Sequence, residues 1–181
     1  MSEIVTAGLL VIGDEILSGR TKDKNIGFIA EYLANIAIDL KEVRVIGDEE
    51  TEIVAALDAL RSRYTYVFTT GGIGPTHDDI TADSVARAFG VGIDHHPGVV
   101  ARFRERFTGQ DLNEARLRMA RIPDGAELIQ SATILAPGFM LGNVIVMAGV
   151  PSIMQAMMDI VAPKLKSGVK MLSESIRANA R

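Results

Sequence analysis

The segment Val67-Phe68-Thr69-Thr70-Gly71-Gly72-Ile73-Gly74-Pro75-Thr76-His77-Asp78-Asp79-Ile80-Thr81 decides the fold of this chain. An apolar run typical of a buried strand leads directly into a loop that has three glycines in four positions. Glycine lets backbone N–H groups approach an anion closely, because no Cβ stands in the way. We expect a helix to follow, with Thr81 as its N-cap and Gly90 at its end. A strand, a glycine loop and a helix N-terminus together make a binding site for phosphate.

The loop differs from two well-known phosphate-binding motifs. It lacks the Gly-Lys-Ser/Thr ending of a P-loop and the third glycine of the dinucleotide-binding fingerprint. The adjacent carboxylates Asp78 and Asp79 would repel a phosphate unless a divalent cation lay between them. We therefore expect Asp78 and Asp79 to hold a divalent metal, Mg²⁺, Mn²⁺ or Co²⁺. The alternative is that both aspartates only cap the following helix.

Strand-like and helix-like segments alternate along the first half of the chain. Two of the strands are apolar almost throughout, as expected when both faces are buried, and the helices show apolar residues at helical spacing. Strands are expected at residues 4–12, 40–46 and 66–70, and helices at 26–36, with Asn25 as a candidate cap, and at 53–60. This order predicts a parallel sheet covered by helices, with ligands beyond the carboxyl ends of its strands. The loops 13–24, 47–51 and 71–80 should therefore converge.

The regular alternation weakens after residue 92. A short strand ending at Asp94 and helical segments at 97–107 and 113–120 indicate a small α+β unit inserted into the sheet. Two apolar runs joined by Gly142-Asn143 then predict a β-hairpin. A last helix, from Ser152 onward, is expected to turn Ile153, Met157, Ile160 and Val161 inward, with Met154 and Met158 widening the stripe. We expect one domain over residues 1–166 and a polar tail over 167–181.

Composition narrows the classes of function. The chain has 181 residues, 48% of them hydrophobic, and a formal net charge of −4. A net negative charge without a dense basic cluster argues against nucleic-acid binding. Cysteine is absent, which excludes disulfides and a cysteine nucleophile. No secretory signal or membrane-spanning run is present, so we expect a cytoplasmic protein without a membrane partner.

The glycine-loop segment resembles the central signature of the molybdopterin-binding (MoaB/Mog) family. Within that family, the chain is most similar to the N-terminal domain of the competence/damage-inducible CinA branch. The matching segments beyond the glycine loop are Gly13-Asp14-Glu15-Ile16-Leu17-Ser18-Gly19-Arg20-Thr21, Met119-Ala120-Arg121-Ile122-Pro123-Asp124-Gly125-Ala126, Ala136-Pro137-Gly138-Phe139 and Gly149-Val150-Pro151-Ser152. The resemblance implies a three-layer α/β/α domain that assembles as a dimer or trimer. Because residues 1–181 do not include the amidohydrolase domain of the CinA branch, we expect a stand-alone form.

The resemblance implies two reactions, both with attack at an adenylyl phosphorus. CinA-like domains resemble metal-dependent pyrophosphatases that split ADP-ribose into AMP and ribose 5-phosphate. Molybdenum-cofactor members transfer AMP from MgATP onto molybdopterin. A third possibility is a domain that binds a nucleotide or pterin without turnover. It is motivated by Ile153, which stands where CinA-like proteins have a glutamate. Gln130-Ser131-Ala132, where they have an Asn-Pro, bears instead on the choice of substrate.

The family motifs also suggest residue roles. Asp79 and Asp48 match the essential carboxylates, and Asp14 or Glu15 could orient the attacking water. Glu15 could instead only organise a turn, and Lys22 and Lys24 could attract phosphates or remain solvated. Matches to the phosphate cradle and the first loop are Gly71, Gly72, Gly74, Thr76, Arg20, Thr21 and Asn25. The expected partner is a small nucleotide or pterin.

Overall fold

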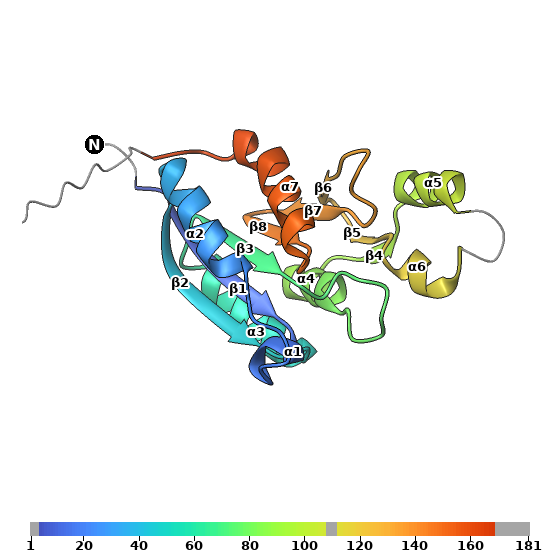
Figure 1. The fold of residues 1–181 in the computed structure, drawn as a ribbon, viewed down its shortest axis with the longest axis horizontal. Coiled ribbons are helices and arrows are strands. Elements are labelled where there is room, and N and C mark those ends of the chain that lie inside the picture. Colours follow the sequence, from blue (N-terminus) through green and yellow to red (C-terminus); the bar gives the residue numbers. More distant parts are fainter. Residues whose placement is uncertain (1–3, 108–111, 169–181) are drawn as a thin grey trace, which may run out of the picture.

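A six-stranded sheet forms the centre of the molecule (Figure 1). The computed structural model describes residues 4–107 and 112–168. The strands of the sheet are β1 (Thr6–Ile12), β2 (Asp39–Ile46), β3 (Tyr66–Thr70), β6 (Glu127–Ile129), β7 (Gly138–Leu141) and β8 (Val144–Met147). Their spatial order is β2-β1-β3-β8-β7-β6. β1 pairs in parallel with β2 and β3, β3 pairs in parallel with β8, and only β7 runs against its neighbours. The mostly parallel sheet expected from the sequence is confirmed.

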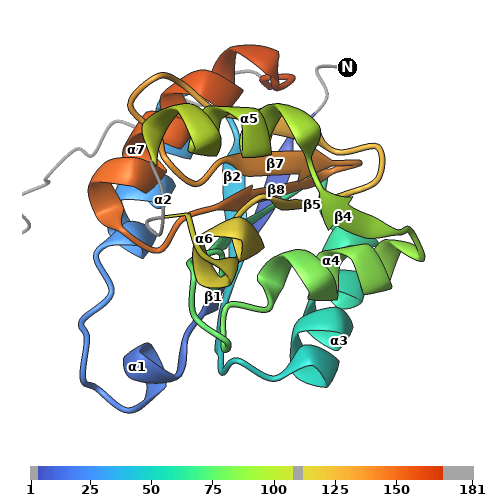
Figure 2. The ribbon, with the colours of Figure 1, turned by 90° about the vertical axis from the view of Figure 1, so that its right-hand side faces the viewer.

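Helices cover both faces of the sheet, which makes three layers. The helices are α1 (Asp14–Leu17), α2 (Asn25–Asn35), α3 (Glu50–Arg61), α4 (Thr81–Phe89), α5 (Pro97–Arg106), α6 (Glu114–Arg118) and α7 (Pro151–Val161), followed by a 3₁₀ turn at Ala162–Lys164. α2 and α7 pack on one face, and α3 and α4 pack on the other (Figures 1 and 2). None of the described helices combines the length and the apolar content needed to cross a bilayer.

The alternation of side chains along β1 explains why it is apolar throughout. Ala7, Leu9 and Val11 point to the α2/α7 face, while Leu10 and Ile12 point to the α3/α4 face, and all are almost fully buried. A strand covered on both faces has no solvent side on which a polar residue would be favoured. Burying one such aliphatic side chain stabilises the fold by about 1.5–3 kcal/mol. β1 therefore anchors both halves of the core and fixes where its following loop emerges.

The methionines of α7 contribute more to the core than the sequence pattern suggested. Met154, Met157 and Met158 are fully buried together with Val161, whereas Ile153 and Ile160 are only partly buried. The flexible thioether side chains fill the irregular space between α7 and the sheet. The predicted inward face of α7 is correct in position, but the methionines are its most buried residues.

The inserted α+β unit and the hairpin both occur where the sequence placed them. β4 (Ile93–His95) and β5 (Arg121–Pro123) form a separate antiparallel pair, with α5 and α6 between them in the chain. A small apolar cluster centred on Val99, Phe103 and Ala120 supports this unit. β7 and β8 pair across a turn in which Gly142 has a φ of 56°. Of the expected polar tail, residues 169–181 lie outside the described residues.

Candidate functional site

Four parallel strands end at the same edge of the sheet and position the site. The loops after β1, β2 and β3 converge there, and the segment after β8 joins them. The backbone N–H of Gly13 donates to the carbonyl of Ile46 at 3.0 Å, and that of Gly71 donates to Met147 at 3.2 Å. The loops are thus held by neighbouring strands at their first residues. The sequence marked Gly149-Val150-Pro151-Ser152 only as a segment that matches the family. Its place beside the glycine loop depends on β8 lying next to β3.

The glycine loop approaches its neighbours too closely for any side chain. Gly71 and Gly72 have φ values of 99° and 66°. A Cβ on Gly71 would lie 2.1 Å from the carbonyl oxygen of Ile12, and one on Gly72 would lie 2.1 Å from the Thr81 hydroxyl. Both the backbone conformation and the available space therefore require glycine here. The loop is a compact, preformed turn against the ends of β1 and α4.

Thr81 closes this loop instead of capping its helix, so the predicted N-cap is wrong. Ile80 occupies the N-cap position of α4, and Thr81 is its first residue. The Thr81 hydroxyl donates to the Gly71 carbonyl at 3.0 Å, and its backbone N–H donates to Gly72 at 3.0 Å. A fully buried hydroxyl needs a partner, and the loop carbonyl supplies it. At the other end, Gly90 ends α4 in the left-handed conformation, as expected.

The carboxylate of Asp79 turns back toward its own loop. It accepts hydrogen bonds from the backbone N–H of Thr76 at 2.8 Å and from the Thr76 hydroxyl at 2.5 Å. A Cβ on Gly74 would lie 2.7 Å from one Asp79 oxygen, so the glycine makes room for this turn. Asp79 therefore orders the glycine loop and does not cap α4. One of its oxygens receives both bonds, which leaves the other available for a cation.

Asp14 and Asp48 hold the first two loops together. The backbone N–H of Asp14 donates to the Asp48 carboxylate at 3.0 Å, and the N–H of Asp48 donates to the Asp14 carboxylate at 3.4 Å. α1, which carries Asp14 and Glu15, is a short helix within a segment that the sequence presented as a plain loop. The reciprocal bonds fix both carboxylates at the same edge of the sheet.

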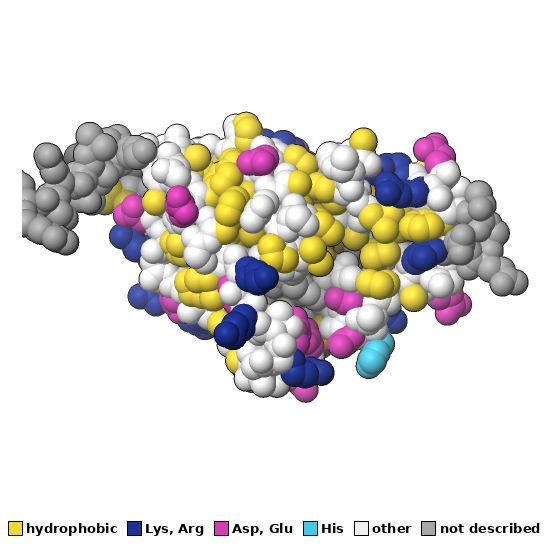
Figure 3. All heavy atoms as spheres, viewed as in Figure 1, with side chains coloured by type: hydrophobic (Ala, Val, Ile, Leu, Met, Phe, Trp, Pro, Cys, Tyr) yellow, Lys and Arg dark blue, Asp and Glu magenta, His cyan; other side chains and the backbone are white. Residues whose placement is uncertain are grey.

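Acidic side chains surround Asp48. Burial raises the pKa of its carboxyl group, and the charges of Asp14, Glu15 and Asp78 raise it further, against the opposing effect of the Asp14 N–H. The space-filling view shows acidic side chains gathered at the lower centre of one face, beside these loops (Figure 3). Carboxylates that repel one another are stabilised when a divalent cation binds.

The protein does not present a complete metal cage by itself. Within residues 4–107 and 112–168, no group of three or more histidine or acidic side chains is placed to bind one ion. Mg²⁺ commonly binds through one or two carboxylates, with substrate phosphates and water as its other ligands. The oxygen donors of Asp48, Asp78 and Asp79 fit that manner of binding better than a closed protein site.

A cavity of about 220 Å³ lies between the first loop, the start of the glycine loop and the β8 segment. Thr21 and Asn25 of the predicted site line it, together with Gly71. From the sequence, Lys22 and Lys24 could either attract phosphates or remain solvated, and both line the cavity too. Arg20, by contrast, is exposed, and its Nε donates to the Ser18 hydroxyl at 3.1 Å. Of the expected first-loop residues, the structure thus places Thr21 and Asn25 at the cavity, but not Arg20.

Asn25 ties the first loop to the β8 segment and does not cap α2. Its side-chain amide donates to the Gly149 carbonyl at 2.9 Å. Lys24 occupies the N-cap position of α2, and the Asp23 carboxylate before it accepts the N–H groups of Asn25 and Ile26, at 3.0 and 2.8 Å. The predicted cap at Asn25 is therefore wrong. This arrangement fixes one wall of the cavity.

A second, narrower hollow lies at the far end of the glycine loop. Gly72, Gly74 and Asp79 line it from the loop, and Arg118 and Arg121 line it from the inserted unit. Arg121 pairs with Asp83 of α4 at 2.7 Å. Neither arginine was assigned to the site from the sequence, although Arg121 lies in a segment that matches the family, because the inserted unit is distant in the chain from the glycine loop.

The comparisons with known proteins agree with this geometry. The model of the family described as the probable molybdopterin binding domain matches residues 8–167. The chain belongs to this family. A CinA-like protein of Geobacter metallireducens is 39% identical over 157 residues, which cover 83% of this chain and 38% of that protein. A probable FAD synthase of Caenorhabditis elegans is 32% identical over 180 residues, which cover 88% of this chain and 35% of that protein.

A solved structure extends the similarity to the fold. The CinA protein of Thermoplasma acidophilum has a TM-score of 0.82 at 30% identity, covering 88% of this chain and 96% of that one. The chain spans 62% of the length of a relative from Aeropyrum pernix and well under half of the two relatives above. The molybdopterin-binding family assignment and its CinA-like character therefore rest on sequence and fold together.

Proposed function

We propose that this domain is a metal-dependent pyrophosphatase that cleaves ADP-ribose-type dinucleotides into AMP and a sugar phosphate. The observation that carries the proposal is the placement of Asp14, Asp48 and Asp78 beside a preformed glycine loop. Backbone N–H groups of such a loop suit a phosphate, whereas the carboxylates require a cation before a phosphate can approach. A substrate that brings a diphosphate and its metal together satisfies both demands.

The proposed reaction is the addition of water across the diphosphate. The water oxygen bonds to the adenylyl phosphorus, and the bond from that phosphorus to the bridging oxygen breaks. Ribose 5-phosphate leaves with the bridging oxygen, and the proton of the water passes to a carboxylate at this edge, Asp14 or Glu15, and then to solvent. Asp48 and the outward oxygen of Asp79 would hold the divalent ion, and Asp78 would add to the negative charge that attracts it. The ion would neutralise charge on the phosphate oxygens when bound.

The relatives support a substrate that contains an adenylyl group joined through a diphosphate. One relative is a CinA-like protein, and another is named a probable FAD synthase, whose product is an adenine dinucleotide. The cavity beside Thr21 and Asn25 is smaller than the roughly 300–1,000 Å³ of pockets that enclose whole ligands. It would therefore take one part of the dinucleotide, with the diphosphate on the glycine loop.

Adenylyl transfer to molybdopterin is the second candidate. It is favoured by the description of the matched family, a probable molybdopterin binding domain. Both reactions would use the same loop and carboxylates, but transfer requires MgATP and a pterin acceptor, whereas hydrolysis requires only water.

The test is AMP release from ADP-ribose by metal-stripped protein after Mg²⁺, Mn²⁺ or Co²⁺ is restored. Asp79→Asn is the informative variant, because asparagine retains an oxygen that accepts the Thr76 bonds but loses the charge. We expect metal-dependent release by the wild type and a loss of roughly a hundredfold or more in the variant. Nucleotide binding without release would contradict hydrolysis. AMP transfer from MgATP only when molybdopterin is added would instead support the second candidate.

A further inference from the structure

The hollow at the far end of the glycine loop is the strongest unassigned feature of the molecule. It lies between the loop, the start of α4 and the inserted unit, and its walls include Gly74, Asp79 and Arg118. Arg118 and Arg121 also line a wider groove of about 380 Å³, together with His95, Glu114 and Leu117. The two spaces therefore share Arg118 and Arg121 as walls.

The two arginines at this place are electrostatically different. Arg121 forms an ion pair with Asp83, so its charge is already compensated. Arg118 is half-buried, and no ion pair or hydrogen bond of its side chain occurs in the described part of the chain. A guanidinium carries five N–H donors in a planar fork that matches phosphate oxygens. Arg118 therefore offers an uncompensated cationic donor beside the loop that suits a phosphate.

The glycine loop runs from the cavity beside Thr21 and Asn25 to the hollow that Arg118 lines. Gly71 lines the cavity beside Thr21 and Asn25, while Gly72 and Gly74 line the hollow with Arg118. A dinucleotide lying along the loop would place one end in the cavity and its second phosphate beside Arg118. The cavity of about 220 Å³ is too small for the whole dinucleotide, so the second half of the ligand would lie outside it.

We propose that Arg118 binds the phosphate that leaves with the sugar, and thereby selects diphosphates over monophosphates. This inference rests on the proposed function, since it assigns the second phosphate of the same substrate. The acidic cluster around Asp48 makes the site unfavourable for a second anionic group unless a cation lies near it. Arg118 supplies that cation from the inserted unit, on the opposite side of the loop from the first-loop lysines.

The experiment measures binding first and turnover second. AMP, ADP and ADP-ribose are titrated by calorimetry, with Mg²⁺ present, into the wild type, Arg118→Ala and Arg118→Lys. Arg104→Ala is the matched control, because Arg104 is an exposed arginine of α5 that lines neither space. We expect Arg118→Ala to weaken ADP and ADP-ribose roughly tenfold to a hundredfold, as for a lost hydrogen bond to a charged group. AMP affinity should change less than about twofold, and lysine should restore part of the loss.

Three outcomes would overturn the inference. Equal weakening of AMP and ADP-ribose would place Arg118 on the adenylyl phosphate, and unchanged affinities would remove it from the site. Absence of binding of all three ligands to the wild type would also contradict it. If the wild type binds ADP-ribose but releases no AMP, the pyrophosphatase proposal fails, whereas the selective loss in Arg118→Ala would still support the phosphate assignment.

Discussion

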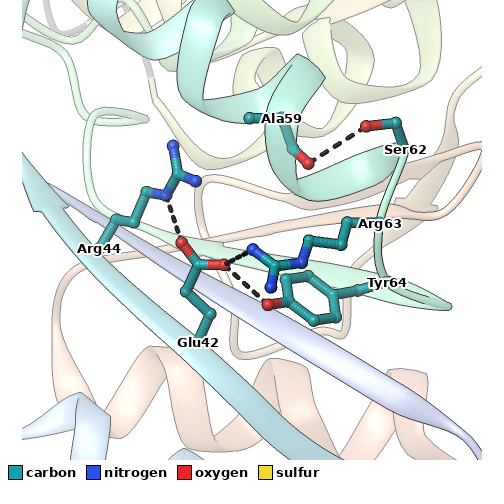
Figure 4. Close-up of polar contacts among 6 residues, drawn as sticks. All are labelled: Glu42, Arg44, Ala59, Ser62, Arg63 and Tyr64. Atoms are coloured by element: carbon teal, nitrogen blue, oxygen red, sulfur yellow. Dashed lines mark hydrogen bonds and ion pairs between the residues drawn. The ribbon is translucent and has the colours of Figure 1, made fainter.

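Glu42 and Asp48 lie on β2 and on the loop directly after it, yet they have opposite surroundings. Glu42 accepts hydrogen bonds from Arg44 at 2.7 Å, from Arg63 at 3.3 Å and from the Tyr64 hydroxyl at 2.7 Å (Figure 4). The bond from Tyr64 contributes most to lowering the pKa of Glu42, followed by that from Arg44. Asp48 is surrounded by Asp14, Glu15 and Asp78, and its pKa is raised.

This difference separates a structural carboxylate from a candidate functional one. The partners of Glu42 come from β2 and the segment after α3, so its charge joins parts of the fold. The neighbours of Asp48 oppose its charge, and the fold tolerates this at an edge where ligands of parallel sheets bind. Unfavourable electrostatics at such an edge is a physical reason to expect a bound cation.

The largest expected effect is on activity. If the proposed hydrolysis holds, Asp48→Asn should lower metal-dependent AMP release by about a hundredfold or more, because a ligand and its charge are lost from the site. Asparagine still accepts the Asp14 N–H, so the loop should keep its shape. Glu42→Gln removes the same charge from the same part of the chain and should leave the rate within about twofold. Parallel measurements of AMP release by the two variants check both expectations. A comparable loss in the two would mean that Asp48 is no more functional than Glu42.

The next effect is stabilisation by the metal. At a Mg²⁺ concentration ten times its dissociation constant, the free energy of unfolding of the wild type should rise by about 1.4 kcal/mol. Glu42→Gln should respond in the same way, while Asp48→Asn should not respond. Thermal unfolding with and without Mg²⁺ tests this. An undiminished response in Asp48→Asn would place the ion elsewhere.

The contrast also shows what sequence can and cannot predict in this chain. The order of strands and helices follows from local periodicity, and the glycine loop follows from its own composition. These features were predicted because they depend on neighbouring residues. The position of β8 beside β3, by contrast, depends on long-range packing and brings in Gly149 as a wall of the site.

Side-chain partners were predicted less well for the same reason. Thr81 looked like an N-cap, but its hydroxyl finds the Gly71 carbonyl ten residues away. The sequence identified Asp79 as a candidate metal ligand, but it did not predict the hydrogen bonds that Asp79 accepts from Thr76. Arg118 carried no local signal, since its position by the glycine loop results from how the inserted unit packs. The family resemblance had already singled out Asp48, and the fold then showed how its surroundings differ from those of Glu42.

The smallest expected effect is on stability without metal, and it depends on pH. A carboxyl group whose folded pKa is raised destabilises the fold above that pKa, and the penalty disappears as pH falls toward the ordinary value of 3.8. Asp48→Asn should therefore raise the free energy of unfolding at pH 7 by less than about 1 kcal/mol, because Asp48 is only partly buried and solvent screens its charge.

For Glu42 the sign is reversed. Its folded pKa is lowered, so its stabilising contribution is present above its ordinary pKa and is lost as pH falls through the folded value. Glu42→Gln should thus lower the midpoint of thermal unfolding at pH 7, and the deficit should shrink in acid. Urea titrations of the three metal-free proteins from pH 7 downward would show the gain of Asp48→Asn and the deficit of Glu42→Gln converging on the wild type. A destabilised Asp48→Asn protein at pH 7 would mean that its bond to Asp14 outweighs the repulsion, and that Asp48, like Glu42, is mainly structural.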